Sequence, residues 1–193
     1  MALFYTGVGS RRTPPDVLAD MEDLARHLAA RDLTLRSGHA EGADQAFEGG
    51  AGGRAEVFVP SARFQAKVPV SGERVLFGSL PQDVWKGAMR TVVHYHPAPW
   101  KLRGWSLDLI ARDACELLGR GLDDPSGFVV CWCGRDADGC PMGGTGQVVR
   151  LAEGWGGEPG YGVPVFNYAE MGRDELWAAV DARVDALLAD DAG

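Results

Sequence analysis

The chain has 193 residues, 46% of them hydrophobic and 24% charged, which is typical of a globular domain with a sizeable core. No apolar run approaches the roughly 20 residues that span a bilayer, and no basic segment followed by a long apolar one opens the chain. We therefore expect a cytoplasmic protein without a membrane partner. The net charge of −8 disfavours a protein that mainly follows a nucleic-acid backbone, although it allows a local basic patch.

Apolar runs alternate with amphipathic segments along the chain. Strands are expected at residues 3–8, 33–36, 55–59, 128–132 and 163–167. Helices are expected at residues 14–31, 42–49, 81–96 and 107–118, then from Gly146 to about residue 153, and at 173–189. This alternation predicts an α/β protein with a Rossmann-like, three-layer architecture, in which helices cover both faces of a mainly parallel sheet. We expect one domain over residues 1–193.

Local signals refine some of these elements. Thr13 is the expected N-cap of the first helix, and Ser106 is the expected N-cap of the fourth. The apolar residues of the third helix recur at helical spacing and are expected to be buried; they are Val84, Trp85, Ala88, Met89, Val92 and Val93. Residues 61–80 show no clear period, and we expect them to form a mobile lid, an insert or an oligomer contact.

Three of the expected strands stop at glycines just before a helix. Such a turn places backbone N–H groups beside a helix N-terminus at the carboxyl edge of the sheet, which suits phosphate or another anion. The first turn differs from the dinucleotide fingerprint, because Arg12 stands near the place of its third glycine. The residues expected to contact a ligand are Gly7, Val8, Gly9, Ser10 and Arg11 in the first turn, Ser37, Gly38, Gly42, Ala43 and Asp44 in the second, and Gly143, Gly144, Thr145 and Gly146 in the third.

These residues also have simpler explanations. The first segment could be a plain tight turn, and Asp44 could stabilise the dipole of its helix or bind a ribose hydroxyl pair. His94, His96 and Trp100 would either frame a nucleotide base or pack around a proline-rich corner.

The chain has four cysteines, Cys115, Cys131, Cys133 and Cys140. They are too few for a disulfide scaffold in a chain of this length, so we expect reduced thiols. Cys131 and Cys133 are separated by one residue instead of the usual two of a zinc site. We expect neither a metal site nor a cofactor.

The glycine turns make the sequence resemble the SLOG superfamily, the Rossmann-like fold shared by DprA/Smf recombination mediators and LOG cytokinin-activating enzymes. The second turn is similar to the S-G-x-A-x-G-x-D segment of DprA. A DprA-like group often carried by bacteriophages is more similar still, through the segments His96–Trp100, Ala111–Asp113, Val130–Trp132, Gly143–Gln147 and Pro164–Asn167. The resemblance implies a nucleotide-binding fold, homo-oligomers, and ligand contacts from Arg112 and Trp132.

The chain departs from this pattern at several positions. Met142 occupies the proline slot of the LOG motif, and the first acid after its glycines is Glu153. The usual carboxylate for cleaving an N-glycosidic bond is therefore absent from its place. Asp113 stands where the DprA-like group has an Asn. If the protein is an enzyme, the resemblance implies a phosphoribohydrolase in which Arg112 holds phosphate and the carboxylate is Asp44, Glu41 or Asp113.

Three functions are compatible with the sequence. The leading hypothesis is the binding of a nucleotide or nucleotide-derived small molecule, by which a phage-type protein would sense or sequester a nucleotide signal. The second is hydrolysis of nucleoside monophosphates. The third is a DprA-like accessory role in binding single-stranded DNA, which the net charge of −8 places last.

Overall fold

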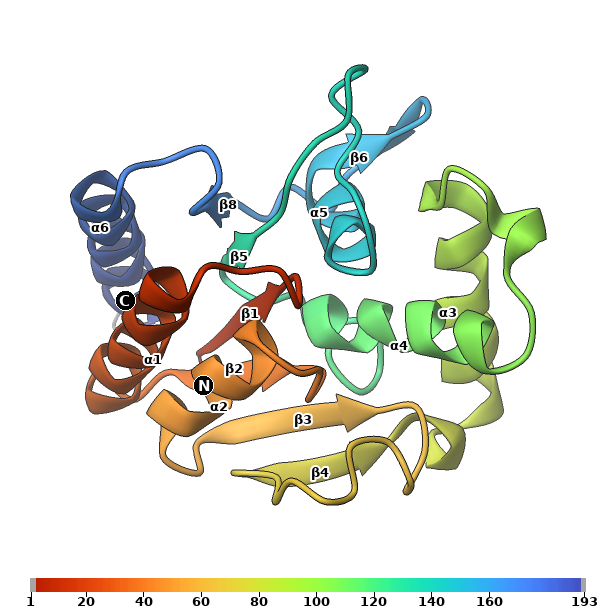
Figure 1. Cartoon of the computed structure of the whole chain (residues 1–193), viewed down its shortest axis with the longest axis horizontal. Helices are drawn as coiled ribbons and strands as arrows, with labels where there is room; N and C mark the ends of the chain where they lie inside the picture. Colours follow the sequence, from red (N-terminus) through yellow and green to blue (C-terminus); the bar gives the residue numbers. More distant parts are fainter. Residues whose placement is uncertain (1–2, 192–193) are drawn as a thin grey trace.

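A computed structural model describes residues 3–191. In this part of the chain, six parallel strands form one sheet in the order β4-β3-β2-β1-β5-β8 (Figure 1). Its strands are β1 (Phe4–Gly9), β2 (Thr34–Ser37), β3 (Ala55–Val59), β4 (Glu73–Leu76), β5 (Val129–Trp132) and β8 (Val165–Asn167). The predicted α/β fold with a mainly parallel sheet is confirmed.

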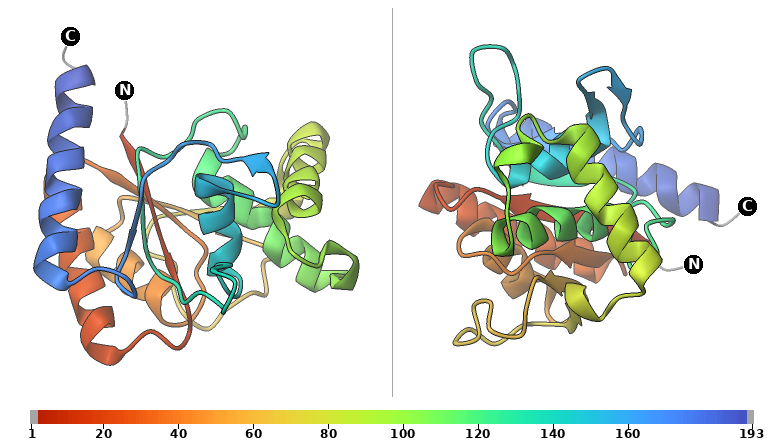
Figure 2. Two further views of the ribbon diagram at one scale, coloured as in Figure 1. Left: turned by 90° about the horizontal axis from the view of Figure 1, so that it is seen from above. Right: turned by 90° about the vertical axis from the view of Figure 1, so that its right-hand side faces the viewer.

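Helices cover both faces of this sheet. The helices are α1 (Pro15–Ala30), α2 (Ala43–Ala51), α3 (Gln82–Tyr95), α4 (Trp105–Leu118), α5 (Thr145–Glu153) and α6 (Arg173–Asp191), with short 3-10 turns η1 (Phe77–Ser79) and η2 (Pro99–Lys101). Figure 2 shows α1 and α6 on one side of the strands and α4 and α5 on the other, with α3 outside α4 and α5. No helix within residues 3–191 is long and apolar enough to cross a membrane.

Each face of the sheet has its own hydrophobic core. One core joins α1, α2 and α6 through fully buried side chains such as Leu24, Phe47 and Val180. The other joins α3, α4 and α5 through Ala88 and Leu117 among others. The central strands contribute to both cores because their apolar residues alternate between faces, as expected of a parallel sheet buried on both sides.

Two predicted helix caps are wrong. Helix α1 begins after Pro14 with no side-chain cap, and the Thr13 hydroxyl instead donates to the Ser10 carbonyl (2.6 Å), which tightens the turn before the helix. Helix α4 begins at Trp105, two residues earlier than predicted, and its N-cap residue is Gly104. Ser106 lies inside the first turn, where its hydroxyl bonds the backbone of Arg103.

Three further differences concern regular structure and burial. Residues 61–80 contain β4 and η1, because Glu73–Leu76 pairs with β3 and extends the sheet by one edge strand. A small hairpin of β6 (Gly154–Trp155) and β7 (Glu158–Pro159) follows α5. Trp85 and Val93, predicted to be buried, are 38% and 64% exposed. The helical spacing is right, but α3 has no neighbour over that side of its apolar stripe.

Candidate functional site

The three glycine turns are neighbours at the carboxyl edge of the sheet. Strand β1 lies between β2 and β5, so the loops that leave these three strands stand side by side. The Ser10 amide donates to the carbonyl of Trp132 at the end of β5 (3.3 Å), and the Gly9 amide donates to Asp44 in α2 (3.1 Å). These two bonds join the first turn to α2 and to the end of β5. The third turn comes back to the end of β5 through the Met142 amide, which donates to the Gly134 carbonyl (2.9 Å). Trp132 itself is half-buried.

Close packing explains the two glycines of the first turn. A Cβ added at Gly7 would lie 2.7 Å from the Phe47 ring, and one at Gly9 would lie 2.4 Å from the Cβ of Ala43. Both glycines therefore let helix α2 approach β1 closely. Val8 is buried in the core of the opposite face.

Asp44 fills the anion site that the first two turns offer. Its Oδ1 accepts the Gly9 amide (3.1 Å) and its Oδ2 accepts the Ala40 amide (3.1 Å). The side chain is buried, which raises the pKa of Asp44, while Arg112 and the two amide donors oppose that shift. These two amides are therefore satisfied by a carboxylate of the chain itself, in the way that a bound anion would satisfy them. Ser37 is likewise engaged internally, because its hydroxyl donates to the Gly7 carbonyl (2.7 Å).

A buried charge cluster lies behind Asp44. The guanidinium of Arg112 occupies the space that a Cβ at Gly38 would take, and it forms an ion pair with Glu116 one turn later on α4. Its Nε lies 3.6 Å from Oδ1 of Asp113. Burial raises the pKa of Asp113 to about 7, opposed by Arg112 and assisted by Asp44. Arg112 is 4% exposed, so it is neither the surface residue nor the open phosphate ligand that its helical position allowed.

The segment between β3 and β4 covers this cluster. The guanidinium of Arg112 lies 5.9 Å from the Phe64 ring centroid, and Nε2 of His39 is 3.1 Å from the Val68 carbonyl. Beneath this segment, His39 Nδ1 contacts Glu48 (2.8 Å), and burial raises the pKa of Glu48 to about 7 against the influence of His39. A phosphoribohydrolase that used Arg112, Asp44 or Asp113 would need residues 61–70 to move. The other candidate carboxylate, Glu41, is exposed.

The third glycine turn is open. Gly143 and Gly144 are exposed, and a Cβ at either would meet no atom closer than 3.9 Å. Their amides make no hydrogen bond to any described residue, and they stand at the N-terminus of α5, where donors and helix dipole favour an anion. Gly146 differs, because a Cβ there would lie 2.3 Å from the Pro141 carbonyl oxygen. Only Gly143 and Gly144 of this turn therefore present exposed backbone amides without a hydrogen bond to a described residue.

Four exposed cations lie on two loops at the carboxyl edge of the sheet. Arg11 and Arg12 follow β1, and Arg63 and Lys67 follow β3; all four are exposed and none forms an ion pair with a described residue. We call them the edge cations. Other cations are divided: Arg26 is paired with Glu22 and Asp23, for example, whereas Lys86, Arg90, Lys101 and Arg103 also form no ion pair with a described residue.

An exposed aromatic residue stands beside the loop that carries Arg63 and Lys67. Trp105 is 56% exposed at the start of α4, and its ring contacts that of Phe64 with centroids 6.2 Å apart. Arg63, Lys67 and Trp105 were not predicted as site residues, because the segments that hold them lack any glycine-turn signal. Their available signal was the alternation of cations and aromatic residues in an otherwise acidic chain.

Comparison with known proteins gives one relationship, based on structure. Neither models of known protein families nor curated proteins match the sequence. The structure is similar to that of DNA processing protein A (DprA) from Helicobacter pylori, which was described for a unique mode of binding single-stranded DNA. The TM-score is 0.52 over 97% of this chain and 81% of that chain, with 17% sequence identity. At this identity the likeness establishes a DprA-like fold, and the ligand has to be argued from the residues.

Proposed function

We propose that the protein binds single-stranded DNA at the carboxyl edge of its sheet. The observation that carries this proposal is the placement of the edge cations: in a chain of net charge −8, Arg11, Arg12, Arg63 and Lys67 have no ion-pair partner within residues 3–191 and stand on two loops of one edge. Unpaired cations can each replace a counterion at a phosphate. The similarity to a DprA that binds single-stranded DNA supports the same ligand.

Trp105 would supply the second element of such a site. Proteins that bind single strands without sequence preference combine backbone contacts from cations with bases stacked on aromatic rings. Trp105 exposes more than half of its surface beside the loop that carries Arg63 and Lys67. A base on this indole would lie next to phosphates held by the edge cations.

The test measures the affinity of a fluorescein-labelled oligothymidylate of about 20 nucleotides by anisotropy over a range of salt concentrations. Four phosphate contacts predict a slope of log K against log[salt] of about −3. Replacing Arg11 and Arg12 together by Ala should reduce the slope to about half, because two contacts are lost. Trp105→Ala should weaken binding by about 1–3 kcal/mol without changing the slope.

The matched control replaces Arg26 and Arg54 by Ala. Both are exposed and paired with acids, at Glu22 and Asp32 respectively, so the same charge is removed away from the edge. This variant should keep the slope of the unmodified protein. Absence of oligonucleotide binding at low salt, or an equal loss in both double variants, would refute the proposal.

The open third turn favours a second candidate, the binding of a nucleotide or nucleotide-derived ligand. The bare amides of Gly143 and Gly144 would receive a phosphate at the N-terminus of α5, with Thr145 as an added hydroxyl donor. A panel of nucleoside monophosphates, ADP-ribose derivatives and cyclic nucleotides should then raise the melting temperature for at least one member. A flat response over the panel would remove this candidate and leave the DNA proposal unaffected.

A further inference from the structure

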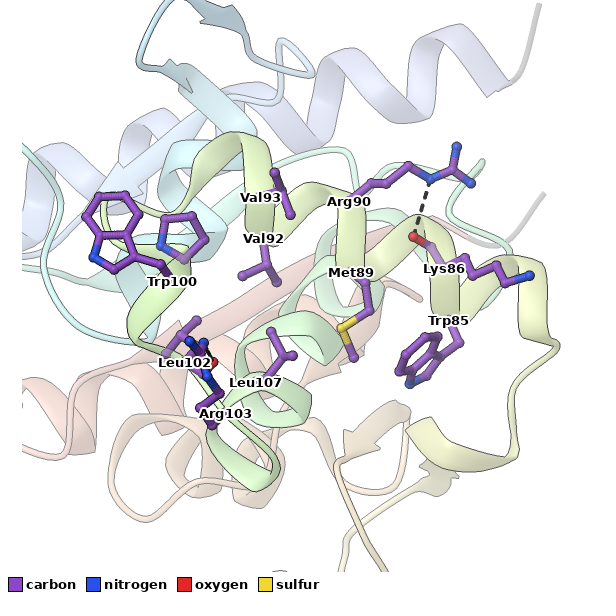
Figure 3. Close-up of a pocket in the computed structure, with 11 residues that line it drawn as sticks. Trp85, Lys86, Met89, Arg90, Val92, Val93, Trp100, Leu102, Arg103 and Leu107 are labelled. Carbon is purple, nitrogen blue, oxygen red and sulfur yellow. Dashed lines mark hydrogen bonds between the residues drawn. The ribbon is translucent and has the colours of Figure 1, made fainter.

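An apolar groove with a volume of about 690 Å³ lies between α3, η2 and the start of α4. Figure 3 shows Trp85 and Trp100 at its two ends. Its floor is made of aliphatic and thioether side chains from all three elements, namely Met89, Val92, Leu102 and Leu107. The volume falls within the roughly 300–1,000 Å³ of typical binding pockets. We call it the α3–α4 groove.

The groove exposes side chains that a monomeric protein would normally cover. Val93 is 64% exposed and Trp100 is 66% exposed, and both line the groove together with Trp85 at 38%. Scattered exposed apolar residues are ordinary, but a contiguous apolar hollow indicates a binding surface.

Cations surround this apolar floor. Residues 84–107 contain Lys86, Arg90, Lys101 and Arg103 and no Asp or Glu, and the nearest acids in the sequence are Asp83 and Asp108 at the two ends of this span. All four are exposed, and three of them line the groove. Figure 3 shows the Lys86 and Arg90 side chains pointing away from the floor, with Arg90 Nε donating to the Lys86 carbonyl (3.3 Å). One acid from another element, Glu158 of the β6–β7 hairpin, contacts α3 at His94 (3.2 Å).

We infer that the α3–α4 groove receives an acidic amphipathic helix from a partner protein. The elements that line it are helical and offer no free strand edge, so an occupant has to satisfy its own backbone hydrogen bonds, as a helix does. The apolar stripe of such a helix would cover the floor between the two indoles. Its carboxylates, next to the stripe, would meet the four cations around the groove.

Charge and chemistry argue against two other occupants. A second copy docked groove to groove would place the same four cations against each other, which is unfavourable in a two-fold interface. A DNA strand would match the cations and could stack a base on either indole, but the aliphatic floor between the indoles offers its bases neither a ring nor a hydrogen bond. The inference is independent of DNA binding at the edge cations.

The experiment uses a fluorescein-labelled synthetic helix of about 16 residues, with Leu at positions i, i+3, i+7 and i+11 and Glu beside this stripe. A matched peptide carries Lys in place of every Glu. The full-length protein should bind the Glu peptide saturably and the Lys peptide at least about tenfold more weakly.

Variants locate the binding. Val93→Asp should weaken Glu-peptide binding by about tenfold or more, because it places a carboxylate on the apolar wall. Arg103→Glu should weaken the Glu peptide and strengthen the Lys peptide, a reversal that misfolding would not produce. Leu188→Asp is the control, since Leu188 is 38% exposed on α6. The Leu188→Asp protein should bind both peptides as the unmodified protein does.

Three results would overturn the inference. The first is that the Glu peptide does not bind saturably, and the second is that both peptides bind with equal affinity. The third is that Val93→Asp binds the Glu peptide as tightly as the unmodified protein does. The oligothymidylate is measured with the same variants. If Val93→Asp weakens the oligonucleotide and leaves the peptide unaffected, the groove holds nucleic acid instead.

Discussion

Replacing Asp113 by Asn should stabilise the protein, and it should do so more at pH 8 than at pH 5. The Asp113 side chain is 5% exposed, and its Oδ2 has no hydrogen-bond partner among the described residues. Burial raises its pKa from 3.8 to about 7; Arg112 opposes the shift and Asp44 adds to it. The folded protein therefore carries a carboxylate that is costly to ionise.

The size of the effect follows from this pKa. Between about pH 4 and pH 7 the folded protein retains a proton that the unfolded chain releases, so the free energy of unfolding falls as the pH rises. One pKa unit corresponds to about 1.4 kcal/mol, which sets an upper limit of about 4 kcal/mol above pH 7. Because neighbouring groups relax around a buried charge, we expect Asn to recover about 1–3 kcal/mol at pH 8.

The assay is urea unfolding followed by tryptophan fluorescence at several pH values from 5 to 8. Asp113→Asn should show a flatter pH dependence than the unmodified protein, with some dependence left because Glu48 also has a pKa near 7. Glu41→Gln removes an exposed carboxylate and is the control. The reasoning fails if the Asp113→Asn curve runs parallel to that of the unmodified protein, or if the variant is the less stable one at pH 8.

Two further predictions concern packing and hydrogen bonding near the edge. Gly9→Ala should cost about 1–3 kcal/mol of stability by forcing β1 away from Ala43, whereas Gly78→Ala, which meets nothing within 4 Å, should be close to neutral in the same urea assay. Asn167→Ala should cost about 2–4 kcal/mol, because the Asn167 side chain accepts from the backbone amides of Cys133 and Ala169 and donates to the Cys133 carbonyl. If Gly9→Ala or Asn167→Ala has a melting temperature within error of that of the unmodified protein, the prediction for that variant is contradicted.

The central layers of the fold could be predicted from the sequence, whereas the edge strand of the sheet and the exposed side of α3 could not. Apolar runs such as Val129–Trp132 have one compatible environment, the middle of a parallel sheet, so the layers could be predicted. Strand β4 was missed because Glu73 and Arg74 are exposed at the sheet edge and give no apolar pattern. Trp85 and Val93 were assigned to the core because helical spacing shows where a stripe lies and does not show which part of it is covered.

The positions of the glycine turns were predictable, but the contacts around them were not. Glycines before helices indicated the carboxyl edge of the sheet for these turns, since parallel strands place their carboxyl ends together. The bond between Asp44 and the Gly9 amide joins residues 35 positions apart, and the burial of Arg112 depends on Phe64 and Gly38. Such contacts arise only when distant segments fold together. Sequence patterns report local spacing, so they could not separate a bound anion from an internal carboxylate.

The order of the strands has a consequence for synthesis of the chain. Strand β1 is flanked by β2, which follows it closely, and by β5, where Val129 lies opposite Thr6. While the ribosome produces the residues between β1 and β5, strands β1 to β4 can pair in succession. The side of β1 that will pair with β5 stays unpaired during this time. Pairing across such a separation is slow, and an open strand margin attracts other nascent chains. The open margin of β1 is therefore most exposed to pairing with other chains before β5 has been synthesised.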